Sequence, residues 1–175
     1  MILVRDFMHA YDEINSGLLC IVVILSLVAC IYLARKEKKW ILASLFALYV
    51  SFLLAGTLLN RVPNDVCEAK LVPFWSYWEM LVIQRENMWK QVLYNIFVFM
   101  PWGILLPVTF VKLRRMRMTL LSAAIFSASI EIIQLVFCLG YFEFDDIFNN
   151  TLGALIGYGL WKLVSKYRRK AMSNE

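Results

Sequence analysis

The chain has 175 residues, of which 61% are hydrophobic and only 18% are charged, whereas a soluble domain carries about 25% charged residues. This composition excludes an ordinary soluble domain and predicts an all-α, polytopic membrane helix bundle. The net charge of +5 does not indicate nucleic-acid binding, because most basic residues stand in short loops between apolar runs. We expect no cofactor, since the chain has one histidine and no Gly-rich phosphate loop.

Five apolar runs are long enough to cross a bilayer, which takes about 20 helical residues. They are expected at residues 16–34, 40–59, 92–111, 119–139 and 147–164. We expect the first span to be retained, because acidic residues rather than a basic segment precede it. The expected organisation is two spans in residues 1–70, a three-span core with an interfacial loop in 71–165, and a basic tail in 166–175.

The basic residues give the expected orientation. Residues 35–39 and 112–117 carry four each and the tail from Lys162 carries five, so these segments hold 13 of the 18 lysines and arginines. Alternating spans place all three segments on one side. The positive-inside rule then predicts an N-terminus outside and a C-terminus in the cytoplasm.

The long loop at residues 60–91 falls outside by this orientation. Its aromatic stretch at 72–78 is expected to lie at the membrane interface, either as an anchor or as a lid. Residues 79–91 are expected to form a short amphipathic surface helix. Cys67 and Cys138 either stay free thiols or, if both face the oxidising side, form a disulfide.

A buried carboxylate marks the candidate site. Glu131 and Gln134 lie within the fourth expected span, where ionisable groups are costly and often functional. Glu131 is about 12 residues, or roughly 18 Å, from the cytoplasmic end of its span. Helical spacing puts two stripes on the fourth and fifth spans, Ala124, Ser127, Glu131, Gln134 and Cys138 on one and Asp146, Asn150, Gly153 and Gly157 on the other.

We expect these stripes to face each other, with Glu131 hydrogen-bonding Asn150 and the glycines packing within the bundle. Asn95, before the Pro101 kink, would form a third wall. Arg85 and Lys90 are candidate cationic partners. The oxygens of Glu143, Asp145, Asp146, Asn150 and Glu131 also resemble a hard-cation site, but they have no fixed ligand spacing, and we predict no metal.

Four ordered motifs in residues 71–160 resemble those of the VanZ-like membrane domain family. The family elements are L-x-P-F, N-x-x-x-F-x-P-x-G, S-x-E-x-x-Q and D-x-x-D-x-x-x-N-T-x-G. They are matched by Leu71–Phe74, Asn95–Gly103, Ser129–Gln134 and Glu143–Gly153. Two positions depart from the family pattern, since Glu143 replaces the first Asp and Tyr141 stands where many members carry Arg. The missing charge would then come from Arg85 or Lys90.

The resemblance implies a multi-pass protein of the bacterial plasma membrane. It assigns the family's polar positions to Asn95, Glu131, Gln134, Asp146 and Asn150, and it implies a link to reduced susceptibility to teicoplanin-type lipoglycopeptides. We therefore expect a non-enzymatic protein that binds or masks a lipid-linked cell-wall precursor or a lipoglycopeptide at the outer leaflet. The ligand-binding residues would be Asn95, Glu131, Gln134, Glu143, Asp146, Asn150 and Arg85.

Three alternatives stay open from the residues. The chain could be a membrane enzyme that acts on a lipid phosphate through Glu131 and the Glu143 and Asp146 carboxylates. It could be a small transporter or flippase subunit with Glu131 as a relay. The polar residues could also serve only to hold the helices together.

Overall fold

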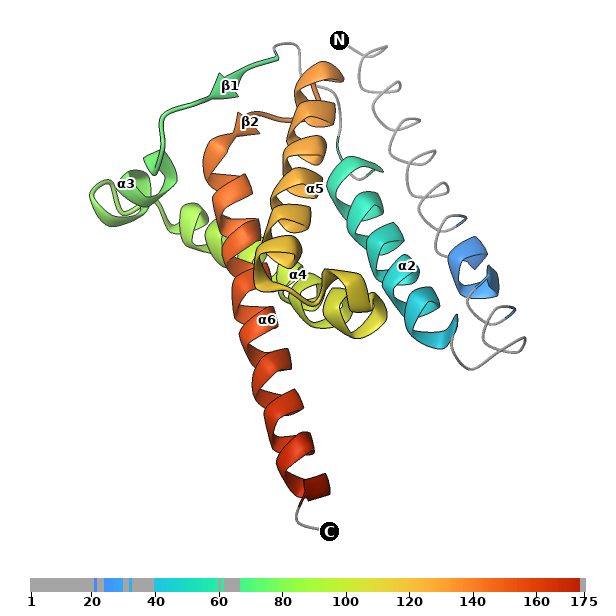
Figure 1. Ribbon diagram of the computed structural model, residues 1–175. Helices are drawn as coiled ribbons and strands as arrows, with labels where there is room; N and C mark the ends of the chain where they lie inside the picture. Colours follow the sequence, from blue (N-terminus) through green and yellow to red (C-terminus); the bar gives the residue numbers. More distant parts are fainter. Residues whose placement is uncertain are drawn as a thin grey trace. The chain divides into compact units, whose positions relative to one another are not determined.

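A computed structural model describes residues 21, 24–29, 32, 40–59, 61 and 67–173. In these ranges the chain is almost entirely helical (Figure 1). The first expected span, at residues 16–34, lies largely outside the described residues. The elements are α2 (Ile41–Leu54), the π-helical η2 (Ala55–Leu59), β1 (Ala69–Lys70), α3 (Trp75–Leu81), α4 (Glu86–Thr109), the 3-10 helix η3 (Val111–Leu113), α5 (Met116–Val136), β2 (Phe142–Glu143) and α6 (Phe144–Ser173).

Three helices in the described part are long and apolar enough to cross a membrane, so the chain is a multi-pass membrane protein. They are Ile41–Leu58, Asn87–Thr109 and Met116–Val136. Each coincides with one of the expected spans. The fifth expected span falls in α6, which is not among the three. Its first turns carry Asn149 and Asn150, and its second half becomes basic from Lys162.

The helix expected at residues 79–91 is wrong. Residues 75–81 form α3, and α4 already begins at Glu86, six residues before the expected span. The helical backbone is interrupted between α3 and α4, where Gln84 has a φ of 56° and Arg85 is extended. Hydropathy missed the early start because the first turns of α4 are polar.

The described chain divides into two compact units, which are treated separately below. The first combines residues 1–70 with 130–142, and the second combines 71–129 with 143–175. Strands β1 and β2 pair, and next to them the Phe142 N–H donates to the Glu68 carbonyl over 3.0 Å.

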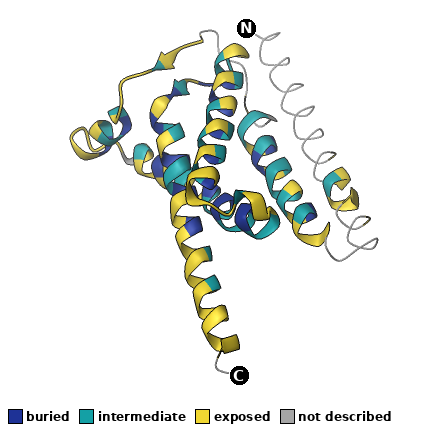
Figure 2. Cartoon of the chain, viewed as in Figure 1, coloured by how far each residue is buried: buried dark blue, intermediate teal, exposed yellow. Residues whose placement is uncertain are grey.

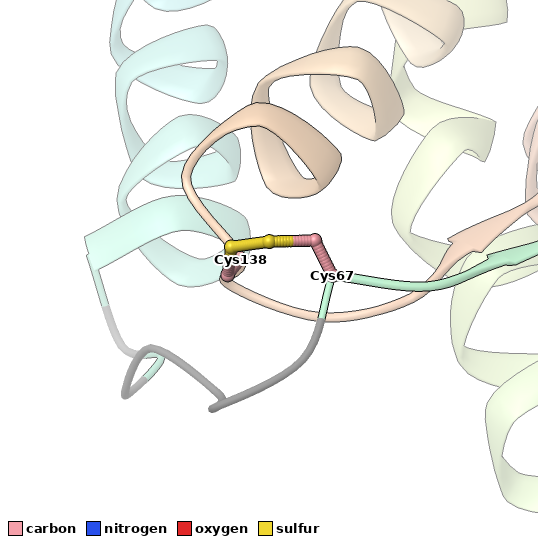
Figure 3. The surroundings of a disulfide bond; sticks show 2 residues. All are labelled: Cys67 and Cys138. Atoms are coloured by element: carbon pink, nitrogen blue, oxygen red, sulfur yellow. A yellow bond between two sulfur atoms is a disulfide. The ribbon is translucent and has the colours of Figure 1, made fainter.

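A disulfide closes the first unit. Cys67 and Cys138 are bonded, with Cα atoms 4.7 Å apart and a sequence separation of 71 (Figure 3). Of the two alternatives that the sequence left open, the structure has the disulfide. Around it, the Lys70 ammonium lies 4.3 Å from the centre of the Tyr141 ring, and the guanidinium of Arg61 lies against Gly140.

Helices α4 and α6 form the centre of the second unit. A Cβ atom added to Gly153 would overlap the Ile96 carbonyl oxygen, and one added to Gly157 would overlap that of Met100. Gly103 of α4 lies equally close to the Ala154 carbonyl. The two backbones are therefore in direct contact, and the partners rise together in number, so the helices run parallel.

The expectation that the glycines pack within the chain is confirmed, but they face α4 rather than α5. The reason is Gly103, because α4 also has a glycine in the contact. With no side chain on either helix at these positions, the two backbones can approach closely. The first part of α5 runs antiparallel to both helices. Trp102 Nε1 donates to Ser122 Oγ over 3.1 Å, and Asn150 Nδ2 donates to Ser127 Oγ over 2.8 Å.

The core of this unit lies beside the first half of α6. Phe99, Trp102 and Phe126 pack there, with the last two ring centroids 4.6 Å apart. Figure 2 shows α6 changing along its length, from buried and half-buried residues in its first half to mostly exposed ones in its second half. On α6 itself, buried polar residues therefore lie in the first half of the helix.

Candidate functional site

Three acids precede or open α6, where the helix dipole favours negative charge, and Asp145 has a structural role. Its carboxylate is fully buried and accepts hydrogen bonds from the Phe74 N–H (2.6 Å), the Ser76 N–H (2.9 Å) and the Ser76 hydroxyl (2.5 Å). These donors belong to the start of α3, which has no cap from its own N-cap residue, Phe74. Asp145 therefore caps α3. Its two carboxylate oxygens accept from α3 rather than pointing to the expected cation site.

The other two acids share one amide. Gln91 Nε2 donates to Glu143 Oε2 over 2.6 Å and to Asp146 Oδ1 over 3.2 Å. Glu143 is 6% exposed, and Asp146 is half-buried. Gln91 was not among the predicted site residues. It could have been found from its position four residues before Asn95, on the same face of α4.

An amide layer of Asn95, Asn149 and Asn150 follows one helical turn further along α4 and α6. Tyr77 donates its hydroxyl hydrogen to Asn149 Oδ1. Asn150 donates to Ser127, which lies one turn before Glu131. Asn150 thus bonds Ser127, on the same stripe of α5, whereas its expected bond to Glu131, which belongs to the first unit, stays a prediction.

Three atoms of this amide layer are buried without a hydrogen-bond partner in the part of the chain that the structure describes. They are Asn95 Nδ2, Asn149 Nδ2 and Asn150 Oδ1. An unsatisfied buried polar atom costs about 1–3 kcal/mol, and native proteins hold few of them. With Gln91, Glu143 and Asp146, the amide layer makes up what we call the polar cluster.

The hydroxyl of Tyr77 stays a donor over the physiological pH range. Burial, together with the negative charge of nearby Asp145, raises the pKa of the Tyr77 phenol above its usual value near 10. The Tyr77 hydroxyl and the Asp145 carboxylate both link α3 to the start of α6.

Helix α3 has two different faces. Ser76 and Met80 are buried, and the Phe74 ring meets Phe148 of α6 edge to face at 5.3 Å. Trp78, Leu81 and Val82 are exposed. An apolar surface with an exposed Trp suits a membrane interface. Both interpretations of this segment, anchor and lid, stay predictions.

The first unit contains Glu131 and Gln134. These side chains are only 3% and 2% exposed, and Ser127 on the same face of α5 is fully buried, so the predicted buried stripe is confirmed for these residues. Gln134 Nε2 donates to the Thr57 carbonyl over 3.0 Å. Thr57 lies in η2, and π-helical turns are frequent at functional sites.

Arg85 is paired with an acid of α3. Its guanidinium lies 2.8 Å from Glu79 Oε2, and its side chain is 58% exposed, which makes this a surface ion pair of small energetic value. Lys90 is also exposed. In the part of the chain described, no three residues among His, Cys, Asp and Glu lie together in a way that could hold a metal ion.

The structure thus defines a class of protein, a multi-pass helical membrane protein with buried carboxylates and amides gathered near one end of two parallel helices. The sequence profile of the VanZ/LLP1 family matches residues 40–165, which is most of the chain, and the protein belongs to that family. The match confirms the resemblance seen in residues 71–160 and extends it to include α2.

One curated relative is Protein VanZ of Enterococcus faecium, which is 30% identical to the chain over 78 residues. The aligned region covers 45% of this chain and 48% of that protein, so the match spans about half of each. No solved structure matches the chain.

Proposed function

We propose that this VanZ/LLP1 protein lies in the plasma membrane with five spans, its N-terminus outside and its C-terminus in the cytoplasm. In this proposal it binds or masks a lipid-linked molecule of the cell envelope at the outer leaflet, through the polar cluster. As for the founding members of the family, the consequence would be reduced susceptibility to teicoplanin-type lipoglycopeptides.

Three independent observations support the orientation. The basic residues concentrate in alternate loops. Helices α4 and α6 run parallel with α5 antiparallel, as consecutive spans would. Cys138 follows the C-terminal end of α5 and is bonded to Cys67, and disulfides persist on the oxidising side of a bacterial membrane. The same end of α5 is the outer end by the positive-inside rule.

The unpaired amide atoms carry the binding proposal. Asn95 Nδ2 and Asn149 Nδ2 are donors without acceptors among the described residues, and phosphate or sugar oxygens of a head group could accept from them. Glu143 and Asp146 add acceptors next to these donors, suited to hydroxyl or amino groups. A sugar-bearing lipid phosphate offers both kinds of group, and so does a lipid-tailed glycopeptide.

The test compares Asp146→Asn with Asp145→Asn in the full chain. We would express each in a susceptible Gram-positive host and measure the minimal inhibitory concentration of teicoplanin beside the melting temperature of the purified protein. The proposal expects Asp146→Asn to keep the melting temperature and lose most of the resistance that the native chain confers. Full resistance in Asp146→Asn, and again in Asn95→Ala at normal expression, would contradict it.

A second candidate function is a membrane enzyme acting on a lipid phosphate, favoured by the two carboxylates that share the Gln91 amide. A small transporter or flippase subunit with Glu131 as a relay is a third. Glu131→Gln separates these candidates from binding, because it keeps hydrogen bonding and removes the charge. Binding alone expects partial retention of the phenotype, whereas proton transfer by Glu131 expects its near-complete loss.

A further inference from the structure

The second unit also contains an open groove at the opposite end of α4 and α6 from the polar cluster. It has a volume of about 730 Å³, within the range of about 300–1,000 Å³ typical of ligand sites. Its walls come from the last turns of α4, from Arg114 directly after η3, and from the second half of α6. The lining residues are Ile104, Val108, Arg114, Leu160, Trp161, Val164, Ser165, Arg168 and Arg169.

Arg114 is fixed in this groove by two hydrogen bonds. Its Nε donates to the Pro107 carbonyl over 2.9 Å, and its own carbonyl accepts from the Tyr158 hydroxyl over 3.0 Å. Pro107 is in the last turn of α4, where carbonyls lack helical partners and basic side chains are favoured. Among the described residues the Arg114 side chain donates through Nε alone, so its two Nη groups keep their capacity to bind an anion as a fork.

Two more arginines line the groove from α6. Arg169 Nε donates to the Ser165 carbonyl over 3.3 Å, and Arg168 stands beside it in the chain. The sequence has no Asp or Glu between residues 104 and 130 or between 147 and 174. No carboxylate on these segments therefore competes for the three guanidinium groups.

The rest of the lining is suited to hydrocarbon. Ile104, Val108, Leu160 and Val164 are apolar, with Leu160 and Val164 about half exposed. Trp161 lies beside them, a residue type enriched where a membrane meets water. A groove with apolar walls and an arginine cluster complements a molecule that has acyl chains and an anionic head group, whereas a soluble anion would leave the walls unused.

We propose that this groove binds an anionic phospholipid, with its phosphate on Arg114, Arg168 and Arg169 and its acyl chains along the apolar wall. The leaflet follows from the orientation proposed above, which makes it the cytoplasmic one. The binding itself does not depend on the polar cluster. Juxtamembrane arginines attract anionic lipids with about 1 kcal/mol each, so each arginine lost should weaken binding about fivefold.

The experiment compares two triple variants of equal charge. Arg114→Gln, Arg168→Gln and Arg169→Gln together remove the groove arginines, while Arg115→Gln, Arg117→Gln and Lys170→Gln remove three neighbouring charges that do not line it. Each purified full chain would be melted in detergent with added phosphatidylglycerol, with phosphatidylcholine and with inorganic phosphate. Native mass spectrometry would count the lipids that remain bound.

We expect phosphatidylglycerol to raise the melting temperature of the native chain and the control variant, and phosphatidylcholine to do so much less. The groove variant should lose this difference and retain at least about fivefold less phosphatidylglycerol. Equal losses in both variants would overturn the proposal, and so would the same stabilisation by inorganic phosphate alone. If the triple variant does not fold, the single change Arg168→Gln on the exposed face of α6 must still reduce retention. Asp146→Asn should leave the lipid effect intact, so the failure of one proposal is distinguishable from the failure of the other.

Discussion

The two ends of the α4–α6 pair differ in chemistry although the same two helices build both. At the start of the pair, carboxylates and amides are buried and mostly bonded to other side chains, as with Gln91 between Glu143 and Asp146. At its end, arginines line an open groove and two of them are held through backbone carbonyls. The first end buries its polar groups and leaves three amide atoms without a partner among the described residues, whereas the second end leaves guanidinium groups at an open groove.

The glycine contact between these ends explains part of the family's motifs. Gly103 is the last residue of the motif Asn95–Gly103, and Gly153 is the last residue of the motif Glu143–Gly153. Both glycines lie in contact with the backbone of the facing helix. Asn95 and Asn150 in the same motifs belong to the polar cluster. Each motif thus combines polar residues of the cluster with a glycine that lets α4 and α6 approach. The groove arginines lie outside all four motifs.

The largest expected effect is on this glycine contact. Gly157→Ala would place a methyl group on the Met100 carbonyl oxygen, and because backbone must then move, we expect a loss of about 3 kcal/mol or more in stability. Gly159→Ala is the matched control, since a Cβ there meets nothing within 4 Å. Thermal unfolding in detergent measures both. Equal melting temperatures would mean that the helices do not touch at Gly157.

The disulfide should make a contribution comparable with that of the glycine contact, and it tests which end of the protein is outside. Closing a loop of 71 residues is worth up to about 4 kcal/mol in the chain-entropy model. A reductant should lower the melting temperature of the native chain but not that of the Cys67→Ser, Cys138→Ser double variant. On intact cells, a membrane-impermeant maleimide should label these cysteines only after reduction. Labelling that requires broken cells would reverse the proposed orientation.

The two adjacent acids should respond very differently. Asp145→Asn weakens three hydrogen bonds to a buried charge and should cost about 2 kcal/mol. Asp146→Asn should cost less than about 1 kcal/mol, because Asp146 is half-buried and its bond to Gln91 is the longer of the two. Urea or thermal unfolding of both variants checks the order. If Asp146→Asn were the more damaging change, the carboxylate in the polar cluster would be the structural one.

Local patterns predicted much of this molecule, and contacts between distant segments account for the rest. Apolar length placed α2, α4 and α5, and helical spacing predicted that Ser127, Glu131 and Gln134 would be buried together. Asp145 caps α3 from about 70 residues further along the chain, and the local sequence around Ser76 does not predict this contact. The stripe on α6 was predicted to face α5, and Asn150 does bond Ser127 there. Its glycines lie against α4 instead, a contact that also needs Gly103, and the spacing within α6 alone does not predict that residue's position.

The smallest expected effect concerns Tyr77, which secures α3 beside the polar cluster. Its folded-state pKa is raised by burial and by Asp145, so the unfolded chain loses this proton first as the pH rises. The stabilisation is therefore complete below about pH 10 and declines as the pH rises from there through the folded-state value. Tyr77→Phe removes the hydroxyl that bonds Asn149 and should cost about 1 kcal/mol at neutral pH. Melting temperatures between pH 8 and pH 11 should fall more steeply for the native chain than for Tyr77→Phe. Parallel curves would place the Tyr77 hydroxyl in water, and α3 would then be joined to α6 through Asp145 without help from the amide layer.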